Sequence, residues 1–514
     1  MKLTKGRHLT ACIAASVMVL FLALLLAGCG LQSKTITSPD QLNDPGVTIG
    51  VVTDTSDGMV VEKEFPKANI EYFRGEMNGF VSVSQGKIDA FVFSKITMNA
   101  AIRAGLKGVK ILDEPVGEPN RGAVVISDAA KIPGLEDKVN EFIDEIKADG
   151  TLDDMKERWI VNADETMPDI KLPENSDIHL VVGTTGTNVP FTYYKGTELA
   201  GYDIELACRF ASWLGATIEF KVYDYDGIIA ASDNGEIDCI FADFFITPER
   251  AEAVTFSQPT SIEEVGIMVR DSSSAGAADS IRNSFERTFL RENRWKLFVS
   301  GIITTLVITS LSVLLGTFLG FFVYMLCRKG NRFANKIAAF CIWLIQGMPV
   351  VVLLMIMYYV IFSGSGLSGA SVSIIGFTLI FAAEVFNMLK GGTGAVDIGQ
   401  TEAAYSLGYT DLQAFFRIVL PQAMPHFIPG YKAQITALMK ATAVVGYLAV
   451  QDLTKMGDLV RSRTYEAFFP LIAVAIIYFI LAAILKRIVG RIEIKVDPRQ
   501  RPAGEILKGI EKHD

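Results

Sequence analysis

A polar segment near the C-terminal end, residues 390–427, combines residue types at a spacing that suits docking against another surface. Small alanine side chains let a helix lie close to a neighbour, a following glycine permits a sharp turn, and a later proline ends the element. No Gly-x-x-x-x-Gly-Lys-Ser/Thr motif occurs in the sequence, so this chain does not itself cradle the phosphates of ATP. We therefore expect this segment to transmit movement between docked parts and not to carry out a covalent reaction. We expect no metal or cofactor. The positions concerned are Glu402, Ala403, Ala404, Gly408, Ile418, Leu420 and Pro421.

The elements that must position this segment are apolar runs of bilayer length. Basic residues gather in the loop after the first run and after the last one, which makes both regions cytoplasmic by the positive-inside rule. An odd number of spans then places the N-terminus outside. Glu384 and Lys440 are ionisable groups within the spans, and they either face a cavity or form structural pairs. The expected spans lie near 298–326, 338–362, 370–389, 428–450 and 467–488.

The first half of the chain has a different composition. Half of all 514 residues are hydrophobic, yet the first 290 carry many charges, which predicts a soluble part followed by a membrane part. A net charge of −9 excludes nucleic acid as a partner, because a polyphosphate needs clustered Lys and Arg.

The first 29 residues are typical of an export signal. A basic start precedes an apolar run over 10–26, and small residues come directly before Cys29, as in a bacterial lipoprotein signal. Cys29 is then the lipidation site, with an uncleaved anchor as the alternative. Cys208 and Cys239 lie in the exported part, where they either form a disulfide or remain buried thiols.

The exported part alternates strand-like and helix-like stretches twice. The segments 47–52 and 90–93 are strand-like in the first repeat, and 179–184 is strand-like in the second. Residues 161–177 are rich in Pro, Asp, Glu and Asn, which is typical of a linker. Gly86-Lys87-Ile88-Asp89 and Gly235-Glu236-Ile237-Asp238 share one frame, which suggests two similar lobes that close on a solute.

The pattern in 390–427 matches the Glu-Ala-Ala signature of ABC-importer membrane subunits in position and spacing. It is followed by Gln422-Ala423, as in the polar amino acid branch of that family, and the resemblance covers about residues 285–493. The resemblance implies a short coupling helix, built from the seven positions above, that docks in a groove of a separate ATPase. It also implies a homodimeric ATPase and a second permease subunit, which we take to be a copy of this chain. Further matching stretches are Ser300-Gly301-x-x-Thr304-Thr305-Leu306, Gly347-Met348-Pro349 and Gly391-Gly392.

The exported part is similar to the amino acid-binding proteins of the same systems, with its lobes in swapped order. Residues 178–270 resemble the usual first lobe, and 40–160 resemble the second lobe with its closing helix. The chain is then either a permuted binding protein whose lobes still pair or the remains of two copies. The stretches that carry the likeness are Pro190-Phe191, Gly201 to Ala207, Ile246-Thr247-Pro248-Glu249-Arg250, Gly86-x-x-Asp89-Ala90 and Asp149 to Trp159.

This second resemblance assigns roles to single residues. Arg250 corresponds to the arginine that holds a ligand's α-carboxylate, for which a guanidinium fork is suited. Tyr225 stands where the family often places an aromatic ring over the ligand side chain. The family's acid for the α-ammonium group is replaced here by Ser94, so we expect Asp243 to make that contact instead. Asp54 and Asp57 are rivals for that role, and Phe191 and Ser56 are further candidate substrate-binding residues.

The sequence thus predicts a multidomain protein, with a two-lobed α/β periplasmic-binding-protein-like domain followed by an all-α membrane bundle of about five spans. Its expected function is import of a polar amino acid or similar small zwitterion by a multi-pass protein of the cell membrane, with extracytoplasmic lobes and a cytoplasmic C-terminus. A degenerate or regulatory binding domain on a permease for another solute is the alternative. A ligand-gated channel or a sensor would leave the coupling signature without a purpose. The expected boundaries are 1–29 signal, 34–165 second-lobe-like, 166–177 linker, 178–270 first-lobe-like, 271–296 linker and interfacial helix, 297–493 membrane domain, and 494–514 cytoplasmic tail.

Overall fold

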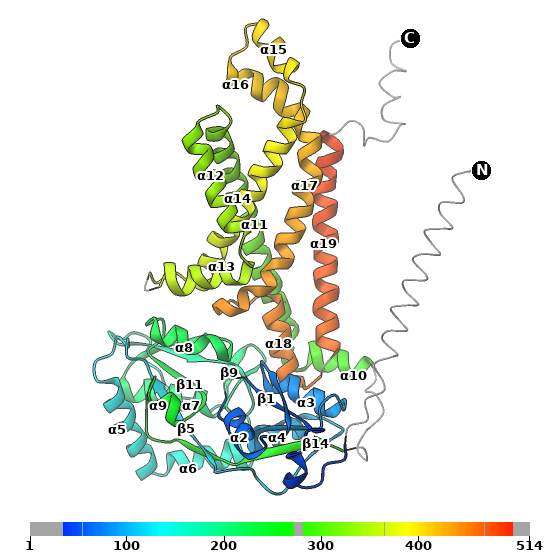
Figure 1. Ribbon diagram of the computed structural model, residues 1–514. Helices are drawn as coiled ribbons and strands as arrows, with labels where there is room; N and C mark the ends of the chain where they lie inside the picture. The colour runs from blue at the N-terminus through cyan, green and yellow to red at the C-terminus, as the bar shows by residue number, and fades with distance from the viewer. Residues whose placement is uncertain (1–33, 54, 272–280, 364, 467, 497–514) are drawn as a thin grey trace, which may run out of the picture. The chain divides into compact units, whose positions relative to one another are not determined.

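The computed structural model describes residues 34–496, except 54, 272–280, 364 and 467. Cys29 and Asp54, most of the expected linker after 270, and residues 497–514 of the expected tail lie outside the described residues. The chain divides into two compact units, each made of two stretches of sequence (Figure 1). The first unit takes Met1–Asn120 and Ile262–Ala278, and the second takes Arg121–Ser261 and Asp279–Asp514.

The first unit is built on a five-stranded sheet in the order β2-β1-β3-β14-β4. Strand β1 pairs in parallel with β2 and β3, whereas β14 runs antiparallel to β3 and β4. Its strands are β1 (Thr48–Val52), β2 (Asn69–Phe73), β3 (Ala90–Ser94), β4 (Val109–Ile111) and β14 (Val265–Arg270). Its helices are η1 (Pro39–Leu42), α2 (Ser56–Glu64), α3 (Glu76–Ser84) and α4 (Lys95–Ala104).

Strand β3 is buried along its whole length, as the run Ala90-Phe91-Val92-Phe93 predicts for a central strand. Gly79 of α3 lies so close to the Phe91 ring that an added Cβ would come within 1.9 Å of it. The helix therefore packs directly on the strand. Gly105 ends α4 at φ 111°, where glycine is favoured.

The α/β part of the second unit holds a sheet in the order β10-β6-β11-β5-β12 and a small antiparallel sheet, β7-β8-β9. Strand β6 lies parallel to both β10 and β11, and β5 runs antiparallel to β11. The strands are β5 (Asn120–Ile126), β6 (His179–Thr184), β7 (Thr187–Asn188), β8 (Thr192–Lys195), β9 (Glu198–Ala200), β10 (Thr217–Val222), β11 (Cys239–Phe245), β12 (Thr255–Phe256) and, at the boundary between the units, β13 (Ser261–Glu263). The helices are α5 (Leu135–Ala148), α6 (Thr151–Lys156), η2 (Glu157–Val161), α7 (Tyr202–Leu214), α8 (Tyr225–Asp233) and α9 (Pro248–Ala251).

Each unit completes its sheet with a strand from the other half of the exported sequence. The chain leaves the first unit after β4, and β5 then joins β11 in the second unit. After β12 the chain returns, and β14 joins β3 in the first unit. The two stretches of sequence are thus connected by two chain crossings and two exchanged strands.

The rest of the second unit is helical. Three helices are long and apolar enough to cross a membrane, and two bent pairs raise the number of candidate spans to as many as five among the described residues. The elements are α10 (Ile281–Phe285), η4 (Glu286–Leu290), η5 (Arg291–Asn293), α11 (Trp295–Cys327), α12 (Arg332–Gln346), α13 (Val350–Ile356), η6 (Met357–Ile361), α14 (Gly369–Gly394), α15 (Ile398–Ser406), α16 (Asp411–Ala414), η7 (Phe415–Val419), α17 (Leu420–Ala441), η8 (Thr442–Leu448), α18 (Leu453–Thr464) and α19 (Phe469–Val496).

The bent pairs refine the expected spans. The second expected span bends by 108° between α12 and α13, and the helix from Asp411 to Leu448 meets α18 at 57°. Pro349 precedes α13, where a proline fits because a first-turn N–H has no helical partner. The predicted fold class is confirmed, with a mixed α/β region and a helical region of three to five candidate spans.

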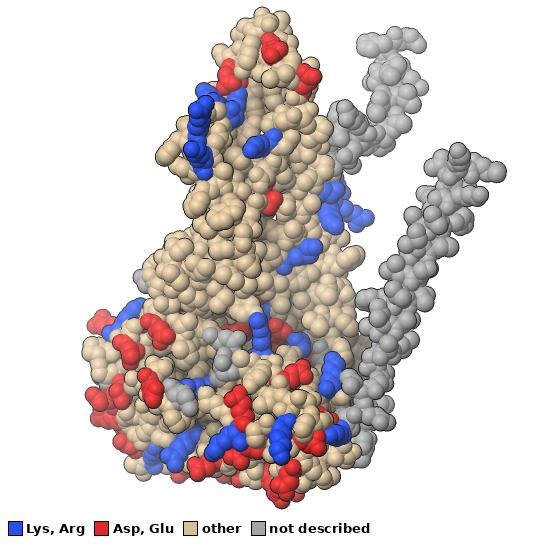
Figure 2. Space-filling view, in the orientation of Figure 1, with Lys and Arg blue, Asp and Glu red and all other residues tan. Residues whose placement is uncertain are grey.

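The helical region packs through small residues. Gly320 of α11 lies against α14, because an added Cβ would come within 2.5 Å of the Ala382 carbonyl oxygen. Figure 1 shows α15 and α16 at one end of the helices and α18 at the other. The helical surface shown in Figure 2 is largely without charge, and charged side chains are dense over the α/β region. That distribution agrees with a membrane part joined to a water-exposed part.

Candidate solute-binding and coupling sites

Arg250 lies in α9, a single turn whose start is capped by Thr247. The Thr247 hydroxyl accepts a hydrogen bond from the Arg250 N–H at 3.2 Å. From there the guanidinium donates to the Phe245 carbonyl oxygen and to the Tyr225 hydroxyl, both at 3.2 Å. The half-buried guanidinium is therefore held in one orientation by α8 and β11 together.

Two aromatic rings form a platform under this arginine. The Tyr225 ring, at the first position of α8, stacks on Phe244 of β11 with centroids 4.7 Å apart and planes 11° apart. The Arg250 guanidinium carbon lies 5.8 Å from the Tyr225 centroid and 5.2 Å from that of Phe244. Sequence reasoning identified Tyr225 and Arg250, and the structure brings them together. Phe244 was missed, because a buried strand phenylalanine gives no sequence signal of its own.

Asp243 stands at an irregularity in β11. The register of β11 against β5 shifts between Ile240 and Phe244, and Asp243 has a φ of 54°. This left-handed backbone turns the residue out of the ladder, as a β-bulge does. Its carboxylate accepts a hydrogen bond from the Asn188 side-chain amide at 2.8 Å, and its N–H donates to the Asp203 carboxylate at 2.6 Å. Burial, and secondly the charge of Asp243, raise the pKa of Asp203 well above its ordinary value.

Phe191 is buried in the protein interior, whereas Arg250 is half-buried. The Phe191 ring meets the Tyr202 ring edge-to-face at 6.0 Å between centroids. The structure therefore places Phe191 in the packed interior beside α7. Cys208 and Cys239 are both free thiols, and burial raises the pKa of Cys208 to about 11.

The first unit places its candidates at helix starts. Ser56 and Asp57 open α2 and are buried, and Asp57 accepts a hydrogen bond from the Asn120 amide at 2.9 Å. Ser94 caps α4 and donates to the buried carboxylate of Glu263. Sequence reasoning missed Glu263, although an acidic pair directly before the apolar strand β14 was a usable signal.

The coupling segment forms two short helices, α15 and α16, separated by a tight turn. Gly408 adopts a φ of 82° there, where a residue with a Cβ would be strained. Glu402 and Ala403 are exposed, whereas Ala404 is buried. Pro421 does not end the segment as expected. It lies in the first turn of α17, which a proline tolerates. Ile418 and Leu420 are half-buried on either side of the step from η7 to α17.

An ion pair connects this segment to the helices. The Arg328 guanidinium at the end of α11 pairs with the Asp411 carboxylate at 2.6 Å, and its carbon lies 4.4 Å from the Phe415 centroid. The Tyr405 hydroxyl of α15 donates to the same carboxylate at 3.2 Å. The segment is thus fixed to α11 by charge and by an aromatic contact.

Within the helices, Glu384 is paired rather than isolated. The side-chain amides of Gln346 and Gln434 donate to its two oxygens at 3.0 and 3.2 Å. Lys440 is exposed.

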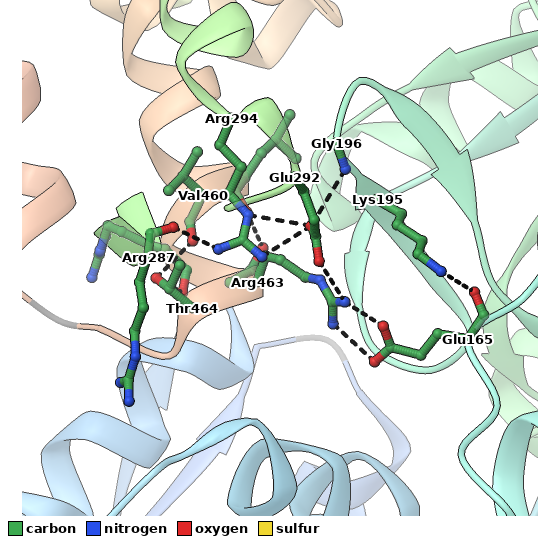
Figure 3. Close-up of polar contacts among 12 residues, drawn as sticks. Glu165, Lys195, Gly196, Arg287, Glu292, Arg294, Val460, Arg463 and Thr464 are labelled. Atoms are coloured by element: carbon green, nitrogen blue, oxygen red, sulfur yellow. Dashed lines mark hydrogen bonds and ion pairs between the residues drawn. The ribbon is translucent and has the colours of Figure 1, made fainter. Parts of the chain in front are cut away.

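A second charged cluster joins the α/β part of the second unit to its helices (Figure 3). Arg463 of α18 donates to Glu165 at 3.0 Å and to Glu292 at 3.1 Å, and it is 10% exposed. Arg294 pairs with Glu292 at 2.9 Å. Burial would raise the pKa of Glu292, but Arg463 and Arg294 outweigh it and lower that pKa. We call Glu165, Glu292, Arg294 and Arg463 the junction cluster.

Further contacts cross the same boundary. Lys455 of α18 pairs with Asp224, and Tyr358 donates to Glu236. Gln451 donates to the Tyr194 hydroxyl at 2.6 Å. The α/β part of the second unit therefore contacts α18 and η6 through several separate polar pairs.

Comparisons with known proteins match both regions. The bacterial extracellular solute-binding proteins, family 3, match residues 180–417. The L-cystine transport system permease protein TcyL of Bacillus subtilis is 32% identical over 190 residues, which are 35% of this chain and 80% of that protein. The putative glutamine transport system permease protein GlnP of Rickettsia bellii is 30% identical over 203 residues, which are 38% of this chain and 92% of that protein. A crystal structure of an amino acid ABC transporter with histidines matches at 28% identity and a TM-score of 0.38, covering 43% of this chain and all of that one.

Proposed function

The chain belongs to the amino-acid ABC transporter permeases and carries a solute-binding domain, and on that basis we propose that it imports a polar amino acid or a similar small zwitterion. The α/β region captures the solute outside the cell, and the helical region passes it inward. The ATP is hydrolysed by a separate subunit that docks on α15 and α16.

The observation that carries the capture step is the fixed guanidinium of Arg250. Tyr225 and Phe245 hold it from two elements, and the stacked pair Tyr225–Phe244 lies beneath it. A guanidinium fork binds a carboxylate through two parallel hydrogen bonds, and an aromatic face accommodates the rest of a small ligand. This arrangement suits an α-carboxylate.

The ammonium group needs an acid, and we assign that role to Asp243. Its carboxylate belongs to the same strand as Phe244 and leaves the ladder at a bulge. Asn188 holds one of its oxygens and so orients the group. The two exchanged strands, β5 and β14, support a single permuted two-lobed domain over the alternative of two incomplete copies.

The transport step rests on the other end of the chain. Arg328, at the end of α11, pairs with Asp411 of the coupling segment, and further basic residues follow it in the loop and at the start of α12. We assign that end to the cytoplasm by the positive-inside rule. The assembly we propose has two copies of this chain and two ATPase subunits, because a closed two-fold pore is the simplest symmetric arrangement.

Calorimetric titration of the full chain in nanodiscs with each of the twenty amino acids tests the capture step. We expect micromolar binding of at least one polar amino acid. Arg250→Ala should weaken it about a hundredfold, since a bidentate charged contact is lost, and Arg250→Lys should weaken it less. Asp243→Asn should weaken the binding of amino acids and leave the binding of des-amino carboxylate analogues unchanged. A folded protein that binds none of the twenty would contradict the proposal and favour a non-amino-acid solute.

A further inference from the structure

A cavity of about 480 Å³ lies beside the coupling segment, away from Arg250. It is open on one side and is lined by the end of α11, the start of α12, the end of α14, the helices α15 and α16, and η7. Ligand pockets for small molecules span about 300–1,000 Å³, so this cavity has room for an amino acid. Its polar lining consists mainly of Tyr324, Arg328, Asn335, Lys390, Thr393 and Asp411.

Two of the lining residues, one cationic and one anionic, each have a side-chain atom that is buried without a hydrogen-bond partner among the described residues. These atoms are the Arg328 Nη1 and the Asp411 Oδ2. Each belongs to the ion pair in which the Arg328 Nη2 and the Asp411 Oδ1 are already joined at 2.6 Å. The pair therefore retains one hydrogen-bond donor and one acceptor that the described residues do not satisfy. A buried polar atom of this kind costs free energy unless a ligand or water satisfies it.

The charges of the cavity match a zwitterion. Arg328 and Lys390 supply cationic groups for a carboxylate, and Asp411 supplies a carboxylate for an ammonium group. In an α-amino acid these two groups are separated by one carbon, so a single molecule can reach both members of one ion pair. The Tyr324 and Thr393 hydroxyls, 2.8 Å apart, add neutral hydrogen-bonding groups on the same wall. A simple anion would leave the Asp411 oxygen facing a like charge.

We propose that this cavity binds a free α-amino acid on the cytoplasmic side and that the bound molecule inhibits transport. The inference rests on the proposed orientation and function. Arg328 and Lys390 belong to the membrane helices, whereas Asp411 starts α16 of the coupling segment. A ligand held by both parts ties the segment to the helices. The coupling segment must move when the ATPase acts, so the ligand slows each cycle.

Two glycines of α14 offer a matched pair of variants. Gly394 lines the cavity, Gly391 does not, and a Cβ added at either one meets nothing within 4 Å. Gly394→Leu should therefore fill the cavity without disturbing the Arg328–Asp411 pair. Gly391→Leu places the same side chain on the same helix outside the cavity.

The experiment uses the complete importer with its ATPase, carrying Arg250→Ala to weaken the outer site. Equilibrium dialysis with radiolabelled glutamine, arginine and cystine should show saturable binding of at least one of them. Gly394→Leu should weaken that binding about tenfold or more, and Gly391→Leu should leave it unchanged. In proteoliposomes with the Arg250 side chain intact, the same amino acid on the ATP side should lower uptake, and Gly394→Leu should relieve that inhibition.

The two hypotheses fail separately. Absence of saturable binding up to millimolar concentration, or equal loss in both leucine variants, overturns the cavity proposal whether or not uptake is observed. Failure of the parent importer to take up any amino acid, with dialysis binding intact, overturns the proposed function and leaves the cavity site standing. Binding without any effect on uptake overturns the inhibitory role.

Discussion

Replacing Arg463 by methionine perturbs the junction cluster at its centre. Methionine keeps an apolar stem and removes the guanidinium that Glu165 and Glu292 share. Removal of one partner from a buried ion pair costs about 3–5 kcal/mol. Because the two carboxylates keep 35% and 25% of their side-chain surface exposed, water offsets part of that cost, and we expect about 2–3 kcal/mol.

The cost should appear as local opening of the junction. A loss of about 2–3 kcal/mol raises an opening equilibrium roughly 30- to 150-fold, since 1.4 kcal/mol is a factor of ten. Hydrogen–deuterium exchange of the full chain in nanodiscs measures this directly. The informative peptides cover residues 192–200, where the Gly196 N–H donates to Glu292, and residues 287–294. Their amide protection should fall by the same factor.

Neutralising one acid provides the internal control. Adding Glu165→Gln to Arg463→Met should restore part of the protection, because Glu165 is the carboxylate left without a cation, whereas Glu292 keeps its ion pair with Arg294. Lys156→Met, which removes an exposed pair with Asp153 at 3.7 Å, should change protection at these peptides by less than about twofold. Unchanged exchange in Arg463→Met would refute the idea that the cluster holds the two parts together.

Three further outcomes are expected. Gly320→Val should lower the fraction of monodisperse protein on size-exclusion chromatography, because its side chain would collide with the Ala382 carbonyl oxygen across the α11–α14 contact, at a cost of about 1–3 kcal/mol. Gly408→Ala should weaken association with the ATPase about fivefold in a pull-down titration, because a φ of 82° costs a residue with a Cβ about 1 kcal/mol. Asp203→Asn should flatten the pH dependence of thermal unfolding. Burial and Asp243 raise the pKa of Asp203, so the stability that its protonated form contributes is present below the unfolded pKa and is lost as pH rises through the folded pKa, and asparagine removes that loss.

Apolar run length predicted the membrane half well, because hydropathy reports how much chain a bilayer can hold. It did not predict the 108° bend between α12 and α13 or the 57° bend before α18. Hydropathy carries no information on direction, and both bends leave composition almost unchanged. The sequence also did not predict that β5 and β14 join the sheets of the other half, because the neighbour of a strand is set by the tertiary fold and not by the strand's own residues.

The candidate site residues that were predicted lie in recognisable local motifs, and those that were missed meet partners far away in sequence. Arg250 and Tyr225 were predicted from motif positions, and the structure joins them by a hydrogen bond of 3.2 Å. The pairing of Glu263 with Ser94 was missed because the two residues are 169 positions apart in sequence. The junction cluster was missed for the same reason, since Glu165 and Arg463 are 298 residues apart. Local spacing finds groups that one segment presents, and it cannot find groups that meet across the fold.

With the lobes in swapped order, the stretch after η2 becomes a connection between the two lobe-like halves. In the binding proteins that this region resembles, the closing helix stands at the end of the domain. Here the chain continues from η2 through residues 162–178 into β6, so the stretch becomes an internal connection. Glu165 lies in that connection and binds Arg463 of α18. Under the proposed permutation, the connection that joins the old ends is therefore the one that contacts the membrane helices. We expect a change in its position during the proposed solute capture to reach α18 through this ion pair, because the Arg463 side chain is 10% exposed and charges withdrawn from water are screened less than surface charges.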